Sequence, residues 1–387
     1  MTDICLTVMI LPFLNDFVRK VKYKLMNHLR REPIKSHNII RGKIEVRKRL
    51  LMSISVLLAV TLIVAGCGSD EGASGGSDGE TITILANSVW PEDNHISQGM
   101  IEFSERVKEA TDGKVEIDVN TGGALGYDGP ELLKAVRDNT VPISDVLLSE
   151  VAGDEKLFGL STLPFLTKNF DEGKAFIDIA RPYYEEVAEE KWNQKILFGG
   201  SWPYAGFWTQ DPVESIDDIQ GLKMRTYDEN GATVVQAAGG TPSPLPFSEV
   251  YSSLSTGVID SVMTSSPTAV DAKFWEVLDY YVPTNVTAAY SIISMNLDEF
   301  NKLDEDLQEA IIEVGQEMDE YMWEKNLALD EEMEGIVVDE GIEILKPSDN
   351  FMNDWSSIGE EIAEEWLKDA PEEAQEIVDK LAEELGR

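Results

Sequence analysis

Short apolar runs alternate with helical patterns through residues 81–150. Residues 81–86 and 114–119 are rich in β-branched residues, which is typical of strands, and residues 146–148 form a third short apolar run. Between the first two runs, apolar residues recur every three or four positions and predict a helix with one buried face: Ile96, Met100, Phe103, Val107 and Ala110. Asp128 and Pro130 stand where a second helix would begin. This alternation predicts a largely parallel sheet with helices on both faces.

The same alternation returns later in the chain. Residues 195–198, 221–226 and 258–263 each read as a strand, and a helical pattern follows the second of them. A further helix opens at Ser248 and closes at Gly257. The sequence therefore predicts a second α/β unit that begins near Trp202.

One helical pattern is unusually long. It runs from Asp304 to about Glu334 with an apolar stripe formed by Leu307, Ile311, Val314, Met318 and Met322. A single helix of this length would span about 45 Å. Because this exceeds the width of one small domain, the helix is expected to run along both domains. Two more helices are expected after it, within residues 355–366 and 377–385.

The segment before Cys67 has the pattern of a secretion signal. Basic residues 47–49 precede an uncharged run, residues 50–66, which ends in small residues before Cys67. This ending resembles the lipobox of bacterial lipoproteins, in which the cysteine is lipidated and becomes the new N-terminus. The alternative is a short transmembrane helix. Residues 68–80 favour the lipoprotein, because they form a Gly, Ser, Asp and Glu tether. Residues 1–45 are not needed by a signal peptide, so translation is expected to begin near Val46.

Charge divides the chain at the same place. Residues 1–67 hold twelve Lys and Arg against four Asp and Glu, whereas the remaining residues hold 20 against 68. A strongly negative field repels nucleic acid and anionic lipid headgroups, so neither is expected as a partner.

Candidate catalytic and metal-binding residues are scarce. The only cysteines are Cys5 and Cys67, and His95 is the only histidine after Cys67, so neither a metal site nor a cofactor is expected. Two matches to the G-x-S-x-G string of hydrolases fall in the tether at residues 72–79, where no strand precedes the serine. Asp304 and Asp306 begin like a calcium loop, but Gly315 stands where its closing Glu belongs. We expect a binding protein rather than an enzyme.

Arg225 is the candidate ligand-binding residue. It lies near the carboxyl end of an expected parallel strand, where ligands bind in open α/β sheets. A guanidinium at this position could hold a carboxylate in a bidentate pair. The alternative is a structural Arg paired with one of the many acidic side chains, and strand position alone does not separate the two.

From residue 81 onward the chain resembles the solute-binding subunits of TRAP transporters, the dicarboxylate-binding-protein-like family. The resemblance covers about residues 81–345, and its motifs follow the family's order and spacing: residues 219–226 (IQGLKMRT), 239–242 (GGTP), 246–251 (PFSEVY) and 254–260 (LSTGVID). Residues 123–126 (GALG) and 163–166 (LPFL) match earlier landmarks.

This resemblance implies a two-domain α/β fold of the periplasmic-binding-protein type, spanned by a long helix, that closes on a small organic acid. It also implies delivery of that acid to an ion-driven membrane permease. The family's carboxylate-binding Arg falls on Arg225, its pocket aromatic residue on Phe247 and its pocket polar residue on Thr264. Further ligand-binding candidates are Ser265, Trp202, Trp90, Asn87 and Ser149.

Two departures from the family bear on the ligand. Residues 262–267 read VMTSSP where many members carry Gln-Glu-Asn-Pro, and no basic residue lies near Gly206, where many carry a second pocket Arg. A single Arg near Trp90, Trp202 and Phe247 favours a monocarboxylate with an apolar or aromatic body. An ATP-driven importer's binding protein and a secreted hydrolase are the alternative functions.

Domain boundaries follow from these patterns. We expect the leader and signal peptide in residues 1–66 and the lipidated cysteine and tether in residues 67–80. The first domain is expected to comprise residues 81–201 with about 290–320. The second domain is expected to comprise residues 202–289 with about 321–387. The mature protein is expected outside the cytoplasm, anchored to the outer face of the membrane at Cys67.

Overall fold

The computed structural model describes residues 81–387. The predictions on the signal peptide, the lipidated Cys67 and the tether lie outside the described residues.

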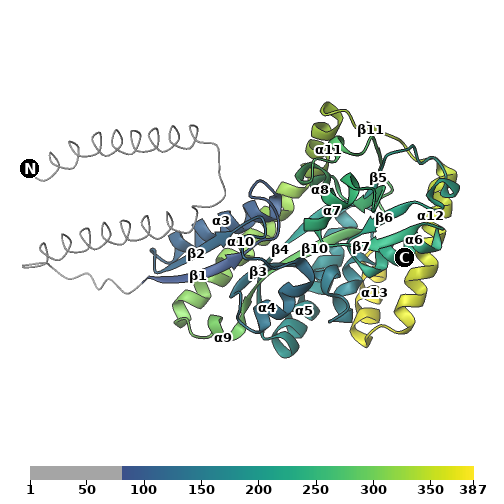
Figure 1. Cartoon of the computed structure of the whole chain (residues 1–387). Helices are drawn as coiled ribbons and strands as arrows, with labels where there is room; N and C mark the ends of the chain where they lie inside the picture. Colours follow the sequence, from purple (N-terminus) through teal and green to yellow (C-terminus); the bar gives the residue numbers. More distant parts are fainter. Residues whose placement is uncertain (1–80) are drawn as a thin grey trace, which may run out of the picture. The chain divides into compact units, whose positions relative to one another are not determined.

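A five-stranded sheet forms the first lobe (Figure 1). Its order is β2 (Val115–Asn120), β1 (Ile82–Asn87), β3 (Ile143–Leu147), β10 (Ala288–Asn296) and β4 (Gln194–Tyr204). The first three strands are parallel, as expected, whereas β10 runs antiparallel to both β3 and β4. The largely parallel prediction was therefore too simple, because the long strands β4 and β10 pair as antiparallel neighbours.

A six-stranded sheet forms the second lobe. Its order is β11 (Glu343–Ile344), β9 (Tyr280–Val282), β5 (Gly206–Thr209), β8 (Ser261–Thr264), β6 (Lys223–Thr226) and β7 (Thr241–Pro244). Strand β6 pairs in parallel with β7 and β8, which places the carboxyl ends of all three at one edge. Strand β5 is antiparallel to β8 and β9.

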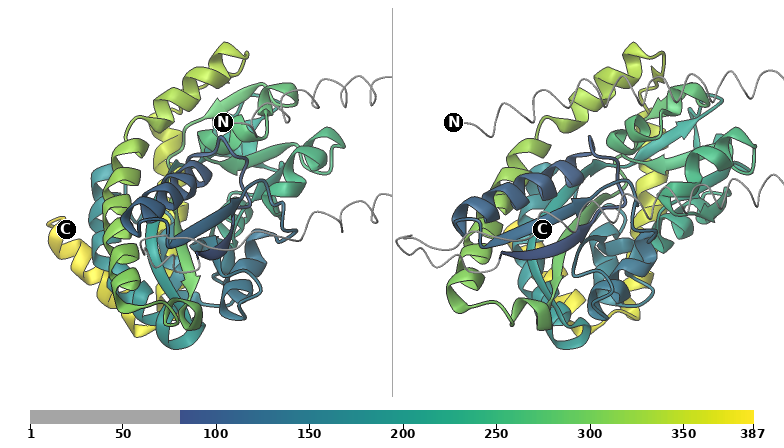
Figure 2. Two further views of the ribbon diagram at one scale, coloured as in Figure 1. Left: turned by 90° about the vertical axis from the view of Figure 1, so that its left-hand side faces the viewer. Right: turned by 60° about the vertical axis from the view of Figure 1, so that its left-hand side comes forward.

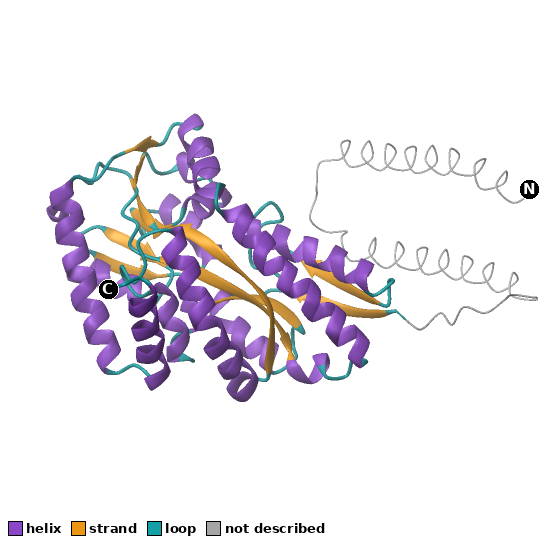
Figure 3. Ribbon diagram, turned by 180° about the vertical axis from the view of Figure 1, so that it is seen from behind, coloured by secondary structure: helices purple, strands orange, loops and turns teal. Residues whose placement is uncertain are grey.

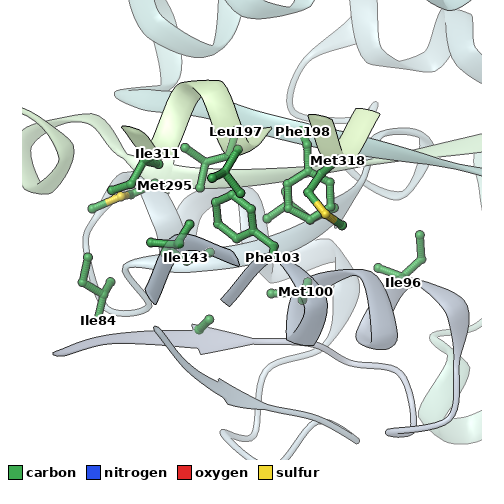
Figure 4. Packing of buried hydrophobic residues seen from close by; sticks show 14 of the residues in the cluster. Ile84, Ile96, Met100, Phe103, Ile143, Leu197, Phe198, Met295, Ile311 and Met318 are labelled. Carbon is green, nitrogen blue, oxygen red and sulfur yellow. The ribbon is translucent and has the colours of Figure 1, made fainter. Parts of the chain in front are cut away.

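Helices cover both faces of the first sheet, as the sequence predicts (Figure 3). Helices α3 (His95–Ala110) and α10 (Glu305–Asn326) bury their apolar stripes on one face. In this core Phe103 of α3 contacts Phe198 of β4 with ring centroids 4.9 Å apart (Figure 4). On the other face lie α4 (Leu132–Arg137), α5 (Phe170–Trp192) and α13 (Glu372–Glu384). The short helix α9 (Leu297–Phe300) follows β10.

The second sheet is covered in the same way. One face packs against α6 (Glu229–Ala237) and α12 (Asp349–Lys368). The other face packs against α7 (Phe247–Ser255), α8 (Ser266–Asp271) and α11 (Leu329–Asp339).

The long helix was predicted as one continuous element, and this prediction was wrong. Helix α10 ends at Asn326 and α11 begins at Leu329, so Leu327 and Ala328 form a break between them (Figure 2). Helix α10 packs on α3 and β4 of the first lobe, whereas α11 packs on α8 of the second. Together, α10 and α11 still run along both lobes. Asn326 is fully buried at that break, where its amide Nδ2 donates to the carbonyl and hydroxyl oxygens of Ser201.

The C-terminal helices divide between the lobes. Helix α12 buries Phe351 and Trp355 in the core of the second lobe, whereas α13 buries Ile377 and Leu381 against α5 of the first. The domain boundaries expected from the sequence stay a prediction. Within residues 81–387, no helix combines the length and the apolar character needed to span a membrane.

Candidate functional site

The candidate site is a narrow cavity of about 20 Å³ between the lobes. Arg225 reaches it from the end of β6 and Thr264 from the end of β8, which lie side by side because the two strands are parallel neighbours. Ser265 caps α8 immediately after β8. The first lobe contributes Trp90, which follows β1, and Trp202, near the end of β4. The remaining lining residues are Leu147, Pro203, Ala205, Tyr227, Thr268 and Ala289.

Arg225 is buried, with 1% of its surface exposed, yet its guanidinium is only partly satisfied. Its Nε donates to the Leu245 carbonyl at 2.9 Å. Within residues 81–387, no hydrogen bond or ion pair holds its two terminal amino groups. Burial lowers the pKa of Arg225, and the carboxyl group of Glu150 opposes that change. Burying a guanidinium without a partner is costly, so these amino groups are suited to an incoming anion.

Trp90 and Trp202, which line the cavity, belong to a small aromatic cluster. Trp90 contacts both Trp202 and Phe247, with ring centroids 4.6 and 5.0 Å apart. Trp90 Nε1 donates to Asp145 Oδ2 at 2.8 Å, and Trp202 Nε1 donates to Ser291 Oγ at 3.0 Å. Both indole donors are therefore paired within the protein, and the tryptophans contribute mainly apolar ring atoms to the site.

The structure brings together five of the eight predicted ligand-binding residues: Arg225, Thr264, Ser265, Trp90 and Trp202 line one cavity. Phe247 packs against Trp90 but lines an adjacent outer cavity of about 340 Å³, whose lining also includes Glu150 and Asp128.

Asn87 and Ser149 lie elsewhere. Asn87 is fully buried beneath the sheet, where its amide donates to Ser144 Oγ at 3.3 Å. Ser149 lines a separate groove beside Asp228. Neither residue lines the Arg225 cavity. Asn87 is the last residue of β1 and its side chain is buried against Ser144 of β3, whereas Ser149 lies in the short 3-10 turn that follows β3.

Sequence reasoning missed three residues near Arg225. Tyr227 follows two positions after Arg225 and lines the same cavity, so strand periodicity could have found it. Asp145 and Glu150 carried no comparable signal, because carboxylates are abundant along the whole chain. Only the fold shows that these two acidic groups are withdrawn from water beside the site.

The lobes touch each other around the cavity. Asn94 Nδ2 at the start of α3 donates to Asp271 Oδ2 of α8 at 2.6 Å. Ser248 Oγ of α7 donates to Asp128 Oδ1 at 2.9 Å, and Asn230 Nδ2 of α6 donates to the Gly159 carbonyl at 2.8 Å. These contacts join the two lobes on several sides of the Arg225 cavity.

A further cavity of about 30 Å³ shares Trp202 and Ala289 with the Arg225 cavity. Apolar and uncharged polar side chains of α5, β4 and β10 form most of its lining, and no ionisable Lys, Arg, Asp or Glu belongs to it. It therefore offers no charged partner for an ionic solute, and the Arg225 cavity is the stronger candidate for a carboxylate.

Asp145 provides a test of burial beside the site. Burial raises its pKa from 3.8 to about 7, against the opposing effect of the Trp90 hydrogen bond. The folded protein therefore holds this proton more tightly than the unfolded chain, and stability falls as the pH rises from about 4 through 7. We expect Asp145→Asn to lose less stability than the parent protein between pH 5 and pH 8, by roughly 2–3 kcal/mol.

Urea denaturation at the two pH values measures this difference. Asn keeps an acceptor for Trp90, and Asp118→Asn on the exposed part of β2 provides a control for charge removal. Identical pH dependence in the Asp145 variant and the parent would show that Asp145 ionises normally.

Comparisons with known proteins agree with this geometry. Residues 86–370 match the family described as bacterial extracellular solute-binding protein, family 7. A solute-binding protein of Sulfitobacter sp. (strain NAS-14.1) is 28% identical over 243 residues, covering 62% of this chain and 73% of the relative. The extracytoplasmic solute receptor DctP7 of Bordetella pertussis, whose crystal structure shows pyroglutamic acid binding, has a TM-score of 0.76 at 26% identity. That match covers 78% of this chain and 99% of the receptor.

A second structure extends the same similarity. A TRAP solute-binding protein from a marine metagenome, crystallised with co-purified pyroglutamate, has a TM-score of 0.75 at 26% identity. It covers 79% of this chain and 99% of its own.

Two lobes around a polar cavity define an extracytoplasmic solute-binding protein, which binds its solute without transforming it. The chain belongs to family 7 of the bacterial extracellular solute-binding proteins, the solute receptors of TRAP transporters. The fold expected from the sequence, an α/β two-domain architecture of the periplasmic-binding-protein type, is confirmed.

Proposed function

We propose that this protein captures a small carboxylate between its lobes and delivers it to an ion-gradient-driven TRAP permease. The observation that carries the proposal is the buried Arg225 guanidinium, whose terminal amino groups face an inter-lobe cavity without a partner among residues 81–387. A carboxylate would accept two parallel hydrogen bonds from these groups. Thr264 and Ser265 supply hydroxyl groups beside them.

The lining of the cavity favours a monocarboxylate. Among residues 81–387, Arg225 is the only basic side chain that lines it, so a second carboxylate would find no cationic partner there. The tryptophan rings favour a ring or another apolar body. Pyroglutamate, the solute of the two structural relatives described above, combines one carboxylate with a small ring and is the first compound to test.

A thermal-shift screen of organic acids with protein from Gly68 onward tests the proposal. A bound solute stabilises the folded state in proportion to the logarithm of its concentration over Kd, so ligands should raise Tm dose-dependently. Pyroglutamate, sugar acids, aliphatic monocarboxylates and dicarboxylates form the panel. The proposal is wrong if no carboxylate raises Tm, or if those that do act equally on an Arg225→Ala variant.

We also propose that the protein is held at the outer face of the cell membrane by lipid on Cys67. The support is the signal pattern of residues 47–66 and the solvated tether of residues 68–80. Cys67→Ser should move the protein from the membrane fraction to the soluble fraction, as measured by immunoblotting. Cys5→Ser is the control and should leave the distribution unchanged. A Cys67→Ser protein that stays in the membrane fraction would argue for a transmembrane helix instead.

A further inference from the structure

Buried acidic groups outnumber the basic group around the Arg225 cavity. Asp145 and Asp228 have 1% and 5% of their surface exposed, and Glu150 stands on the first-lobe side, opposite Arg225. Lys156, a basic side chain on the groove beside Asp228, already donates to the Asp369 carbonyl at 2.7 Å. An added anion therefore meets one positive charge and three acidic groups.

The carboxyl group of Glu150 has no partner of its own. No hydrogen bond or ion pair holds it within the part of the chain that the structure describes. It lies directly against Gly129, where an added Cβ would stand 1.7 Å from Glu150 Oε2. It lines the outer cavity together with Phe247, whose ring contacts Trp90 of the inner cavity. Glu150 and Phe247 therefore line a cavity next to the Arg225 cavity, and the contact between Phe247 and Trp90 connects the two.

The aromatic wall is suited to a cation. Trp90 and Trp202 both line the cavity, and the faces of aromatic rings attract cations through their quadrupole. The hydrogen bond from Trp90 Nε1 to Asp145 Oδ2 adds a negative group behind that ring, which strengthens the attraction. Asp145 Oδ1 is buried without a hydrogen-bond partner among the described residues.

We propose that the preferred solute is a zwitterion, with its carboxylate on Arg225 and a cationic nitrogen against the Trp90 and Trp202 rings on the side of Glu150. This inference rests on the proposed carboxylate-binding function and narrows the class of solute. A zwitterion satisfies Arg225 without adding net negative charge beside Glu150, Asp145 and Asp228. A simple carboxylate leaves the acidic excess uncompensated.

Isosteric pairs test the inference directly by calorimetry. Glycine betaine and 3,3-dimethylbutanoate differ only by nitrogen for carbon at the branched centre, and L-proline and cyclopentanecarboxylate differ in the same way within a ring. In at least one pair, the zwitterion should bind about tenfold more tightly or better, which corresponds to 1.4 kcal/mol. Glu150→Gln should narrow this gap, whereas Asp118→Asn removes an exposed charge on β2 that lines neither cavity and should preserve it.

The pH dependence supplies a second readout. Burial raises the pKa of Glu150 to about 7, with Arg225 lowering it and Asp145, Asp228 and Asp128 raising it. A cationic group favours the ionised carboxylate and releases its proton, so affinity for the zwitterion should rise between pH 6 and pH 8. A simple carboxylate favours the protonated form, so its affinity should fall over the same range.

The outcomes separate this inference from the proposed function. If pyroglutamate or another simple carboxylate binds through Arg225 while every zwitterion binds equally or more weakly, the zwitterion inference is overturned and the carboxylate function stands. If neither zwitterions nor simple carboxylates bind in an Arg225-dependent way, both are wrong. Tm measurements on each variant exclude loss of folding as the cause.

Discussion

Arg225→Ala should weaken binding of the solute by about two to three and a half orders of magnitude. Removing one partner of a buried ion pair costs about 3–5 kcal/mol, and each 1.4 kcal/mol changes Kd tenfold. The loss is expected to be this large because Arg225 is 1% exposed and no other basic side chain lines its cavity. Isothermal titration calorimetry with the solute identified by the thermal-shift screen provides the measurement.

Two further variants test whether the guanidinium group of Arg225 causes the loss of affinity. Arg225→Lys keeps the charge but loses the planar fork of donors, so its affinity should lie between those of the parent and the alanine variant. Arg137→Ala removes an exposed guanidinium that pairs with Asp138, and it should bind normally. If Arg225→Ala remains folded and loses less than tenfold in affinity, Arg225 does not hold the carboxylate.

Gly315→Ala should destabilise the fold by about 2–3 kcal/mol. Gly315 lies in α10 where the helix passes closest to β4, and an added Cβ would stand 2.2 Å from the Leu197 carbonyl oxygen. The obstacle is the backbone of β4, and both neighbours of Leu197, Ile196 and Phe198, are paired with β10, so it cannot move aside as a side chain could. Urea denaturation of the tether-free protein measures the change.

Gly335 offers the matched control within α11. An added Cβ there meets no atom within 4 Å, so Gly335→Ala should gain about 1 kcal/mol from helix propensity alone. A loss of stability in Gly315→Ala and a gain in Gly335→Ala would show that the close approach of α10 and β4 causes the loss. Equal changes in stability at the two positions would contradict this explanation.

The local sequence patterns predicted several of the strands and the position of Arg225. The strands that were expected at residues 81–86, 114–119 and 221–226 are present as β1, β2 and β6, with ends shifted by one or two residues. The position of Arg225 at the carboxyl end of β6 followed from the alternation of strands and helices. These features depend on short-range periodicity, which a single sequence carries.

Features set by the meeting of distant segments could not be predicted in this way. Strand β10 is antiparallel because it pairs with β4, about 90 positions earlier in the chain. The break after α10 arises because α10 and α11 pack on different lobes, and the apolar stripe that ends at Met322 was its only local sign. Glu150 and Asp145 differ from the other acidic residues only in their buried surroundings, which raise their pKa values. Their residue types are among the commonest in the chain, so the sequence gives no sign of them.

Both ends of the described region belong to the first lobe. Strand β1 begins there at Ile82, and α13 returns there to pack on α5, with Arg387 paired to Glu172. A protein attached to a sensor surface by either end of this region is therefore held through its first lobe alone. Residues 81–387 contain no cysteine, so a single Val258→Cys substitution, at a site 59% exposed on the second lobe, would carry one fluorescent dye. A change in the distance of that dye from the surface on addition of solute would show that the second lobe moves relative to the first.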